Sequence, residues 1–134
     1  MGEANADETV EIESPFAFEA TLQRIGSAIE GAGLMIFARV DHAANARAVG
    51  MTMPPATVLI YGHAKGGTPV MLGAPLAALD LPLRVLVRER EDGRAAIAFH
   101  PVGPMLRRAG ASEELASRLA PAQKLLVTAV TPQV

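Results

Sequence analysis

Asp41 and His42 are adjacent polar residues at the point where an alternating apolar run ends. A carboxylate beside an imidazole is suited to general acid–base catalysis, so both are candidate catalytic residues. The pair also suits a structural role, because aspartate is a good helix N-cap and His42 would then be the first residue of a short helix that ends near Gly50. The sequence leaves both interpretations open.

A glycine-rich stretch after the next apolar run predicts a binding site for an anion. Its candidate binding residues are Gly62, His63, Lys65, Gly66, Gly67 and Thr68. Thr68 followed by Pro69 predicts the start of a helix, whose free N–H groups and dipole favour an anion beside the positive charge of Lys65. The alternative is a tight turn in which the glycines serve only the backbone geometry.

The three histidines, His42, His63 and His100, each fall just after the expected end of a strand. Imidazoles that meet at one edge of a sheet can hold Zn²⁺ or a similar ion, and Asp41 would then be close by. Because strand directions are not readable from the sequence, no metal is assigned and the three histidines remain candidate ligands. No cofactor is identified.

The composition limits the chemistry that these residues can support. With 134 residues the chain fits a single domain, expected over residues 9–134. The absence of cysteine excludes disulfides, thiolate metal sites and a cysteine nucleophile. A net charge of −2 and 4% aromatic residues argue against nucleic acid as a partner.

The beginning of the chain and its longest uncharged stretch bear on localisation. Residues 1–8 are acidic and aperiodic, the opposite of the basic region that opens a signal peptide, so we expect an acidic tail and a cytoplasmic protein. Residues 48–64 are uncharged but contain two prolines and a histidine, unlike a membrane span of about 20 apolar residues. No membrane association is therefore expected.

Hydrophobic periodicity predicts an α+β fold. Strands are expected at residues 9–13, 34–40, 57–61, 83–90 and 94–99, and helices at 15–31, 42–49, 69–74 and 112–126. Ser14 is expected to cap the first helix with Pro15 as its first residue, and Pro121 to kink or divide the last one. Together these elements predict a two-layer sandwich of about five mostly antiparallel strands with helices on one face.

The strands at 83–90 and 94–99 are expected to form a hairpin with a three-residue loop ending at Gly93. This loop places Val87 opposite Ile97, so that apolar side chains face each other. Alternation along 34–40 places Leu34, Ile36, Ala38 and Val40 on one face and Met35, Phe37 and Arg39 on the other.

The outward face of the expected sheet predicts a homodimer. Its apolar residues are Met35, Phe37, Leu86, Ala96 and Ala98, and its rim consists of Arg39, Arg84, Arg88 and Arg90. Such a patch is larger than monomers usually expose. A second basic group, formed by Arg107, Arg108, Arg118 and Lys124, is interpreted as solvated helix surface.

Five short blocks occur in one order between Asp41 and Pro101. They are Asp41, His42, Ala43 and Ala46; Gly50, Met53, Pro54 and Pro55; Tyr61, Gly62, Lys65, Gly67, Thr68 and Pro69; Asp80, Leu81, Pro82 and Leu83; and Asp92 and Gly93. In these blocks the chain resembles the bacterial and archaeal family called domain of unknown function 302. The resemblance implies a compact α+β domain, often paired as a homodimer, and no activity.

The chain departs from the pattern of that family at two histidines. The family pattern after the central strand is aromatic, Gly, Asn, Pro, whereas the sequence here reads Tyr61, Gly62, His63, Ala64. At the end of the hairpin the family tends to have an aromatic, Asn, Asp, Pro, and here Phe99, His100 and Pro101 stand instead. A role that depends on those asparagines therefore does not transfer directly.

Three classes of function follow from the sequence. The leading hypothesis is a small cytoplasmic homodimeric domain that binds an anionic or small polar ligand. The first alternative is a metal-binding protein or acid–base enzyme that uses Asp41, His42 and His63. The second alternative is a structural or partner-binding module without a small-molecule site.

Overall fold

The computed structural model describes residues 8–132, so apart from Glu8 the acidic tail expected at residues 1–8 lies outside the described residues. The described strands are β1 (Val10–Glu13), β2 (Met35–Asp41), β3 (Ala56–Gly62), β4 (Leu83–Glu89) and β5 (Ala95–Phe99). The α-helices are α1 (Phe18–Gly31), α2 (His42–Ala48), α3 (Ala64–Gly73), α4 (Val102–Arg108), α5 (Glu113–Ser117) and α6 (Pro121–Ala129), and a 3₁₀ helix, η1, spans Pro75–Leu79. The helix α4 had no counterpart among the predicted elements.

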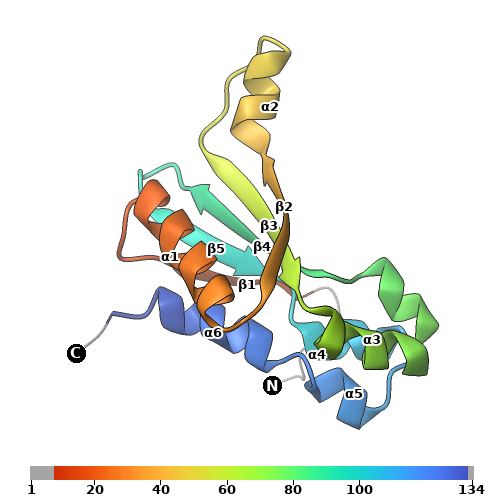
Figure 1. Ribbon diagram of the computed structural model, residues 1–134. Helices are drawn as coiled ribbons and strands as arrows, with labels where there is room; N and C mark the ends of the chain where they lie inside the picture. The colour runs from red at the N-terminus through yellow and green to blue at the C-terminus, as the bar shows by residue number, and fades with distance from the viewer. Residues whose placement is uncertain (1–7, 133–134) are drawn as a thin grey trace.

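The five strands form one antiparallel sheet in the order β1-β5-β4-β3-β2. Helix α1 packs on β3, β4 and β5, and α6 packs beside α1, as Figure 1 shows. Helices α3, α4 and α5 gather at one end of the sheet, while α2 projects from the other end (Figure 1). The predicted α+β sandwich with an antiparallel sheet is confirmed.

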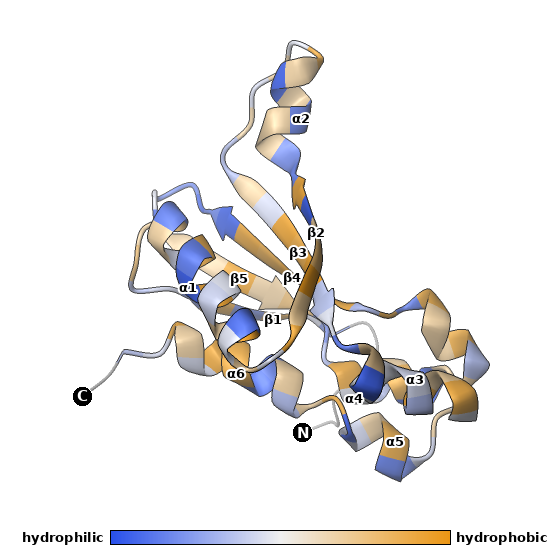
Figure 2. Ribbon diagram, viewed as in Figure 1, coloured by the Kyte–Doolittle hydropathy of each residue, from blue (hydrophilic) through white to orange (hydrophobic). Residues whose placement is uncertain are grey.

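The core lies between the sheet and the helices that pack on it, and the apolar stripe predicted for α1 is confirmed. Phe18, Ile25 and Ile29 are all buried and pack against the inward residues of the central strands. Those central strands are coloured toward the hydrophobic end of the scale in Figure 2. Burying such side chains contributes about 1.5 to 3 kcal/mol each, which is why the stripe fixes the helix on this face.

The start of α1 differs from the prediction. Ala17, not Ser14, is the N-cap, and it makes no side-chain capping bond. Ser14 is buried instead, where its hydroxyl oxygen lies 2.6 Å from Thr21 Oγ1 and accepts a bond from the Phe16 N–H. A local backbone bond of this kind competes with capping, because serine can satisfy nearby N–H groups in a non-helical turn.

The hairpin confirms its predicted register. Val87 pairs with Ile97, and Gly93 has a φ of +85°, which is the left-handed conformation that favours glycine. The Gly93 N–H donates to the Arg90 carbonyl at 2.9 Å, which closes the three-residue loop. The three-residue loop, which was predicted by placing apolar side chains opposite each other, is therefore confirmed.

A β-bulge in β2 overturns the predicted alternation of that strand. The register shifts between Ile36 and Ala38, so that Phe37 has no partner on β3. Ile36 pairs with the buried Tyr61, and Arg39 pairs with Leu59 on the helix-covered face, where it approaches Gly26 of α1. Arg39 therefore does not belong to the rim of the outward face, as predicted, and Phe37 leaves the strand's two-residue period.

The face of the sheet away from α1 is apolar and lies outside the core. One row of paired residues crosses it: Val40, Val58, Leu86, Ala98 and Glu11. The apolar members of this row, together with Ile60, are not part of the hydrophobic cluster beneath the helices. We call Val40, Val58, Ile60, Leu86 and Ala98 the open face. On the β1 side of the open face, Arg88 forms an ion pair with Glu11, with 2.9 Å between Arg88 Nε and Glu11 Oε2.

The C-terminal helices agree with the sequence in two respects. Ser112 caps α5, with its hydroxyl accepting from the Leu115 N–H at 3.3 Å. Pro121 divides the predicted last helix, and it opens α6 at a position where its missing N–H costs nothing. The buried Gln123 of α6 bonds the backbone on both sides of Pro101, since its oxygen accepts from Val102 and its amide donates to His100.

Candidate functional site

A cavity of about 840 Å³ lies where the end of β3 and α3 meet the C-terminal helices. It is lined by the loop after α1, the start of β2, residues 61–68, the segment before β4, the connection between α5 and α6, and α6. This volume falls within the range of about 300 to 1,000 Å³ that is typical of small-molecule sites. All six predicted anion-site residues line it: Gly62, His63, Lys65, Gly66, Gly67 and Thr68.

The glycine-rich stretch is the first part of a helix, which corrects its predicted conformation. Helix α3 begins at Ala64 and contains Pro69, whereas the sequence predicted a start at Thr68 and Pro69. His63 is the N-cap, and its Nδ1 accepts from the Lys65 N–H at 3.0 Å. An imidazole nitrogen thus takes the role usually filled by Ser, Thr, Asp or Asn.

The same cap removes the backbone donors that were expected to bind an anion. The N–H groups of Gly66 and Gly67 both donate to the His63 carbonyl at 3.0 Å, and the Lys65 N–H is already bonded. The first turn of α3 therefore offers no cluster of free N–H groups toward the cavity. Because Nδ1 of His63 accepts, the neutral ring carries its proton on Nε2.

The charges in the cavity lining are all positive. Lys65 on α3 and Arg118 at the end of α5 line it, and no aspartate or glutamate does. Within residues 8–132, neither cation forms an ion pair with a carboxylate. The cavity therefore combines two exposed, uncompensated cations with no opposing charge.

The walls of the cavity are mainly apolar. They are formed by half-buried side chains that continue the core outward: Leu34, Met71, Leu81, Leu119 and Leu125. Gly66 packs closely against Leu119, because a methyl group added at Gly66 would lie 3.4 Å from Leu119 Cδ2. The apolar walls and the cations lie in one cavity, so a ligand there would meet both.

Tyr61 forms part of the cavity floor and is fixed by one hydrogen bond. Its side chain is buried, and its hydroxyl donates to the Ala122 carbonyl of α6 at 2.8 Å. Burial raises the pKa of the Tyr61 phenol far above its usual value, because the phenolate would lose its hydration. Tyr61 therefore stays protonated and joins β3 to α6 rather than acting as a base.

Asp41 and His42 have the structural role that the sequence allowed. The Asp41 carboxylate accepts from the Ala44 N–H at 2.9 Å and caps α2, in which His42 is the first residue. Asp41 pairs with Thr57, whereas Gly62, next to His63, pairs with Met35 six residues away along β2. At about 3.3 Å per residue this separates Asp41 from the end of the sheet that carries His63 by roughly 20 Å. The structure does not bring Asp41 and His42 together with His63.

The three histidines do not meet. His42 and His63 follow neighbouring antiparallel strands, so they lie at opposite ends of the sheet. His100 follows β5 at the same end as His63, but its Nδ1 lies 3.3 Å from Thr9 Oγ1 and from the Glu8 carbonyl oxygen. Among the residues that the structure describes, no three His, Asp or Glu side chains gather as a metal site.

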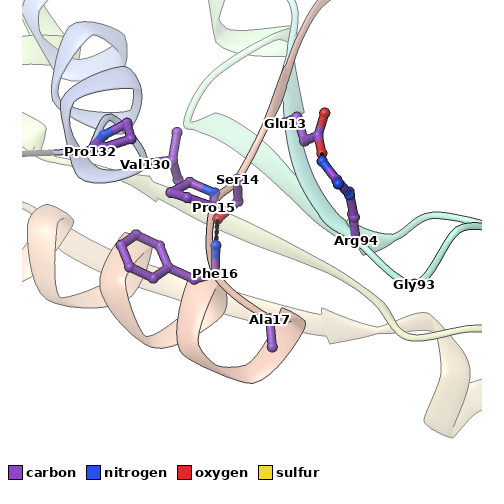
Figure 3. A pocket seen from close by; sticks show the side chains of 9 residues that line it. All are labelled: Glu13, Ser14, Pro15, Phe16, Ala17, Gly93, Arg94, Val130 and Pro132. Atoms are coloured by element: carbon purple, nitrogen blue, oxygen red, sulfur yellow. Dashed lines mark hydrogen bonds and ion pairs between the residues drawn. The ribbon is translucent and has the colours of Figure 1, made fainter.

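A second hollow, of about 580 Å³, lies beside the hairpin loop and the segment before α1 (Figure 3). Glu13 and Arg94 point toward each other there and form an ion pair. The hydrogen bond that the Arg94 guanidinium donates to the Glu13 carboxylate, reinforced by the charge of Glu13, raises the pKa of Arg94. The buried Ser14 below them is satisfied by Thr21 and Phe16. This hollow presents paired charges and bonded polar groups.

Several cavity residues were not predicted from the sequence, and those farthest along the chain come from the segment between α5 and α6 and from α6. Arg118, Leu119 and Leu125 lie fifty or more residues after the glycine-rich stretch. The sequence alone predicts Arg118 to be part of a solvated basic surface. The only local signal was its position beside the apolar stripe of the C-terminal helices, and the tertiary fold is needed to connect it with Lys65.

Comparison with known proteins decides the family. Residues 10–131 match the family described as "Domain of unknown function DUF302". The chain belongs to the DUF302 family. This confirms the resemblance drawn from its sequence blocks. The crystal structure of an uncharacterized conserved DUF302 protein from Bacillus stearothermophilus superposes with a TM-score of 0.79, covering 93% of this chain and 97% of that chain. Its 14% sequence identity makes this a similarity of fold.

This DUF302 chain also matches part of larger proteins. It is 34% identical over 85 residues to "Fluoride-specific ion channel FluC 1" of Brucella suis and to "Fluoride-specific ion channel FluC 2" of Brucella melitensis. The match covers 63% of this chain and 34% and 32% of those proteins, so the chain spans about a third of their length. In residues 8–132, no helix has the length and apolar character needed to cross a membrane.

Proposed function

We propose that this DUF302 domain binds a small anionic ligand in the cavity between α3 and the C-terminal helices. The observation that carries the proposal is the lining of that cavity: Lys65 and Arg118 are its only formal charges, and neither is paired with a carboxylate in the described residues. Two like charges held at one cavity without a counterion attract an anion of complementary charge. Binding without catalysis is proposed, because the acid–base candidates lie elsewhere.

The experiment is a thermal-shift screen of small anions with the purified domain, followed by calorimetry. A bound ligand should raise the midpoint of unfolding with the logarithm of its excess over Kd, by mass action on the native state. Lys65→Met and Arg118→Met should weaken binding. Lys124→Met is the matched control, since this exposed lysine of α6 does not line the cavity. Equal binding by all four proteins would contradict the proposal.

The Brucella relatives raise the question of whether fluoride is the ligand. Their names identify them as fluoride-specific ion channels. A cavity of about 840 Å³ with leucine walls is far larger and less polar than a single fluoride ion requires. We therefore include fluoride in the screen with chloride as its control, and we do not propose it as the ligand.

We propose further that two copies of the domain pair through the open face. Its five apolar residues lie outside the core, and Arg88 beside them is neutralised by Glu11 of the same chain. Apolar sheet faces of this kind are usually covered, and a second copy of the same face is self-complementary. The interface differs from the one expected from sequence. Val40, Val58 and Ile60 join its apolar residues, whereas Met35, Phe37 and the buried Ala96 leave them, and Arg39 leaves its rim.

Sedimentation equilibrium tests the pairing. The wild-type chain should sediment as a dimer, and Leu86→Glu should shift it toward monomer by placing a carboxylate in the middle of the open face. Leu76→Glu is the matched control, because this leucine lies on η1 and is 74% exposed. A 14.0 kDa monomer at all concentrations up to the solubility limit would contradict the dimer.

A further inference from the structure

We call the cavity between α3 and the C-terminal helices the α3 cavity. We infer that its ligand is a small amphiphile, with an anionic head at Lys65 and Arg118 and an apolar body against the leucine walls. The inference rests on the proposed binding function and specifies the chemical class of its ligand. Three features of the cavity lead to it: its walls, the placement of its charges and the state of its backbone donors.

The walls favour an apolar body. Leu34, Leu81, Leu119 and Leu125 pack on the core with one side and line the cavity with the other, so each remains half-buried. A ligand with methylene or ring carbons would complete the burial of these side chains. Each methylene that is removed from water should raise affinity about fourfold.

The charges favour a head group at one end of the ligand. Lys65 belongs to the first turn of α3, and Arg118 directly follows α5; their neighbours Gly66 and Leu119 lie close together, since a Cβ at Gly66 would be 3.4 Å from Leu119 Cδ2. Both side chains are exposed, so their long stems can reach a shared anion near the opening. Because exposed ion pairs are weak, each cation should contribute about two- to fivefold in affinity.

The backbone argues against a bare inorganic anion. Small anions such as phosphate are usually held by several free N–H groups at a helix N-terminus. Here the N–H groups of Lys65, Gly66 and Gly67 are already bonded to His63 at 3.0 Å. With only two exposed side-chain cations available, phosphate lacks the donors for tight binding, and the apolar body must supply most of the affinity.

A homologous series of carboxylates tests the inference by calorimetry. Butanoate, hexanoate and octanoate should bind with an affinity that rises about fourfold per methylene, while acetate, phosphate and fluoride should show no measurable heat. Octanoate should bind two- to fivefold more weakly to Lys65→Met and to Arg118→Met, and about tenfold more weakly to the double variant. Lys124→Met should bind like wild type.

A variant that fills the cavity separates site binding from non-specific partitioning. Gly67→Leu should abolish octanoate binding, because a side chain there points toward Met71 and Leu81, 3.7 and 4.0 Å from its Cβ. Octanoate binding that persists in this variant would overturn the inference.

The outcomes also separate the inference from the proposed function. If phosphate or acetate binds as tightly as octanoate and depends on Lys65, the site is an anion site and only the amphiphile inference fails. If octanol binds as tightly as octanoate, the head-group assignment fails. If no probe binds, both the proposed function and the inference are rejected.

Discussion

Two hollows of this domain, the one beside the hairpin and the α3 cavity, differ in which of their polar groups are already bonded. In the hollow beside the hairpin, Glu13 and Arg94 neutralise each other and Ser14 is bonded on both sides. In the α3 cavity, Lys65 and Arg118 have no carboxylate partner in the described chain, and the leucine walls remain half-buried. The comparison teaches that unsatisfied groups, more than volume, distinguish a candidate binding site from a structural depression.

The largest effect on stability is expected in the hairpin hollow. Ser14→Ala should destabilise the fold by about 1 to 3 kcal/mol, because it leaves the Phe16 N–H without its acceptor and removes the bond between the Ser14 and Thr21 hydroxyls, so that Thr21 keeps only its bond to the Phe16 carbonyl. Urea denaturation measures this change. Octanoate binding should not change in this variant, and a loss of binding with unchanged stability would reverse the roles assigned to the two hollows.

Tyr61→Phe should have the next largest effect. Loss of the 2.8 Å bond to the Ala122 carbonyl should destabilise the fold by about 1 kcal/mol. The raised pKa of Tyr61 also makes the stability of the fold depend on pH. The contribution of Tyr61 to the free energy of unfolding is complete below about pH 10, the usual tyrosine pKa, and is lost as the pH rises above it.

The chain has a single tyrosine, so phenolate absorbance reports on Tyr61 alone. The folded wild-type protein should show no phenolate at a pH where a free tyrosine is half ionised, and the phenolate should appear only on unfolding. The free energy of unfolding of Tyr61→Phe should be flatter above pH 10 than that of wild type. A normal titration in the folded state would contradict the burial of this residue.

Gly67→Leu should act in the opposite direction. Replacing a helix-interior glycine by a good helix former should stabilise the fold by about 0.8 to 1 kcal/mol, and the surrounding contacts leave room for a Cβ. Thermal unfolding checks the gain, and the same protein should have lost octanoate binding. Higher stability with reduced binding would identify the cavity as a site kept open at a cost to stability.

Arg94→Ala should have the smallest effect. Arg94 is exposed, and exposed ion pairs contribute little after solvent screening. We expect no change in the free energy of unfolding beyond experimental error, and no change in octanoate affinity. A measurable loss of binding would show that the hairpin hollow, not the α3 cavity, recruits the anion.

Elements with a strong period or a strong cap were predictable from the sequence. The stripe of α1, the Val87–Ile97 register and the Asp41 cap each depend on neighbours within one element or one hairpin. The start of α3 was not predictable, because Thr68 and Pro69 give a standard start signal that His63 overrides five residues earlier. Histidine is an uncommon residue at an N-cap position.

The candidate site was predictable on one side only. Residues 62–68 stood out by their glycines and lysine, and all six candidates named within them line the cavity. The opposite wall depends on how α5 and α6 dock against α3, which no local pattern encodes. The bulge at Phe37 was not predictable either, because it depends on how β2 pairs with β3. No glycine or proline marks its position in the sequence.

The bulge in β2 also affects how the protein meets other molecules of its kind. β2 forms one edge of the sheet, and a regular edge strand presents a row of free N–H and C=O groups on which another strand can build. The extra residue at Phe37 breaks the spacing of that row and increases the local twist. The same insertion that places an aromatic residue in the cavity lining therefore protects the edge against strand-by-strand aggregation.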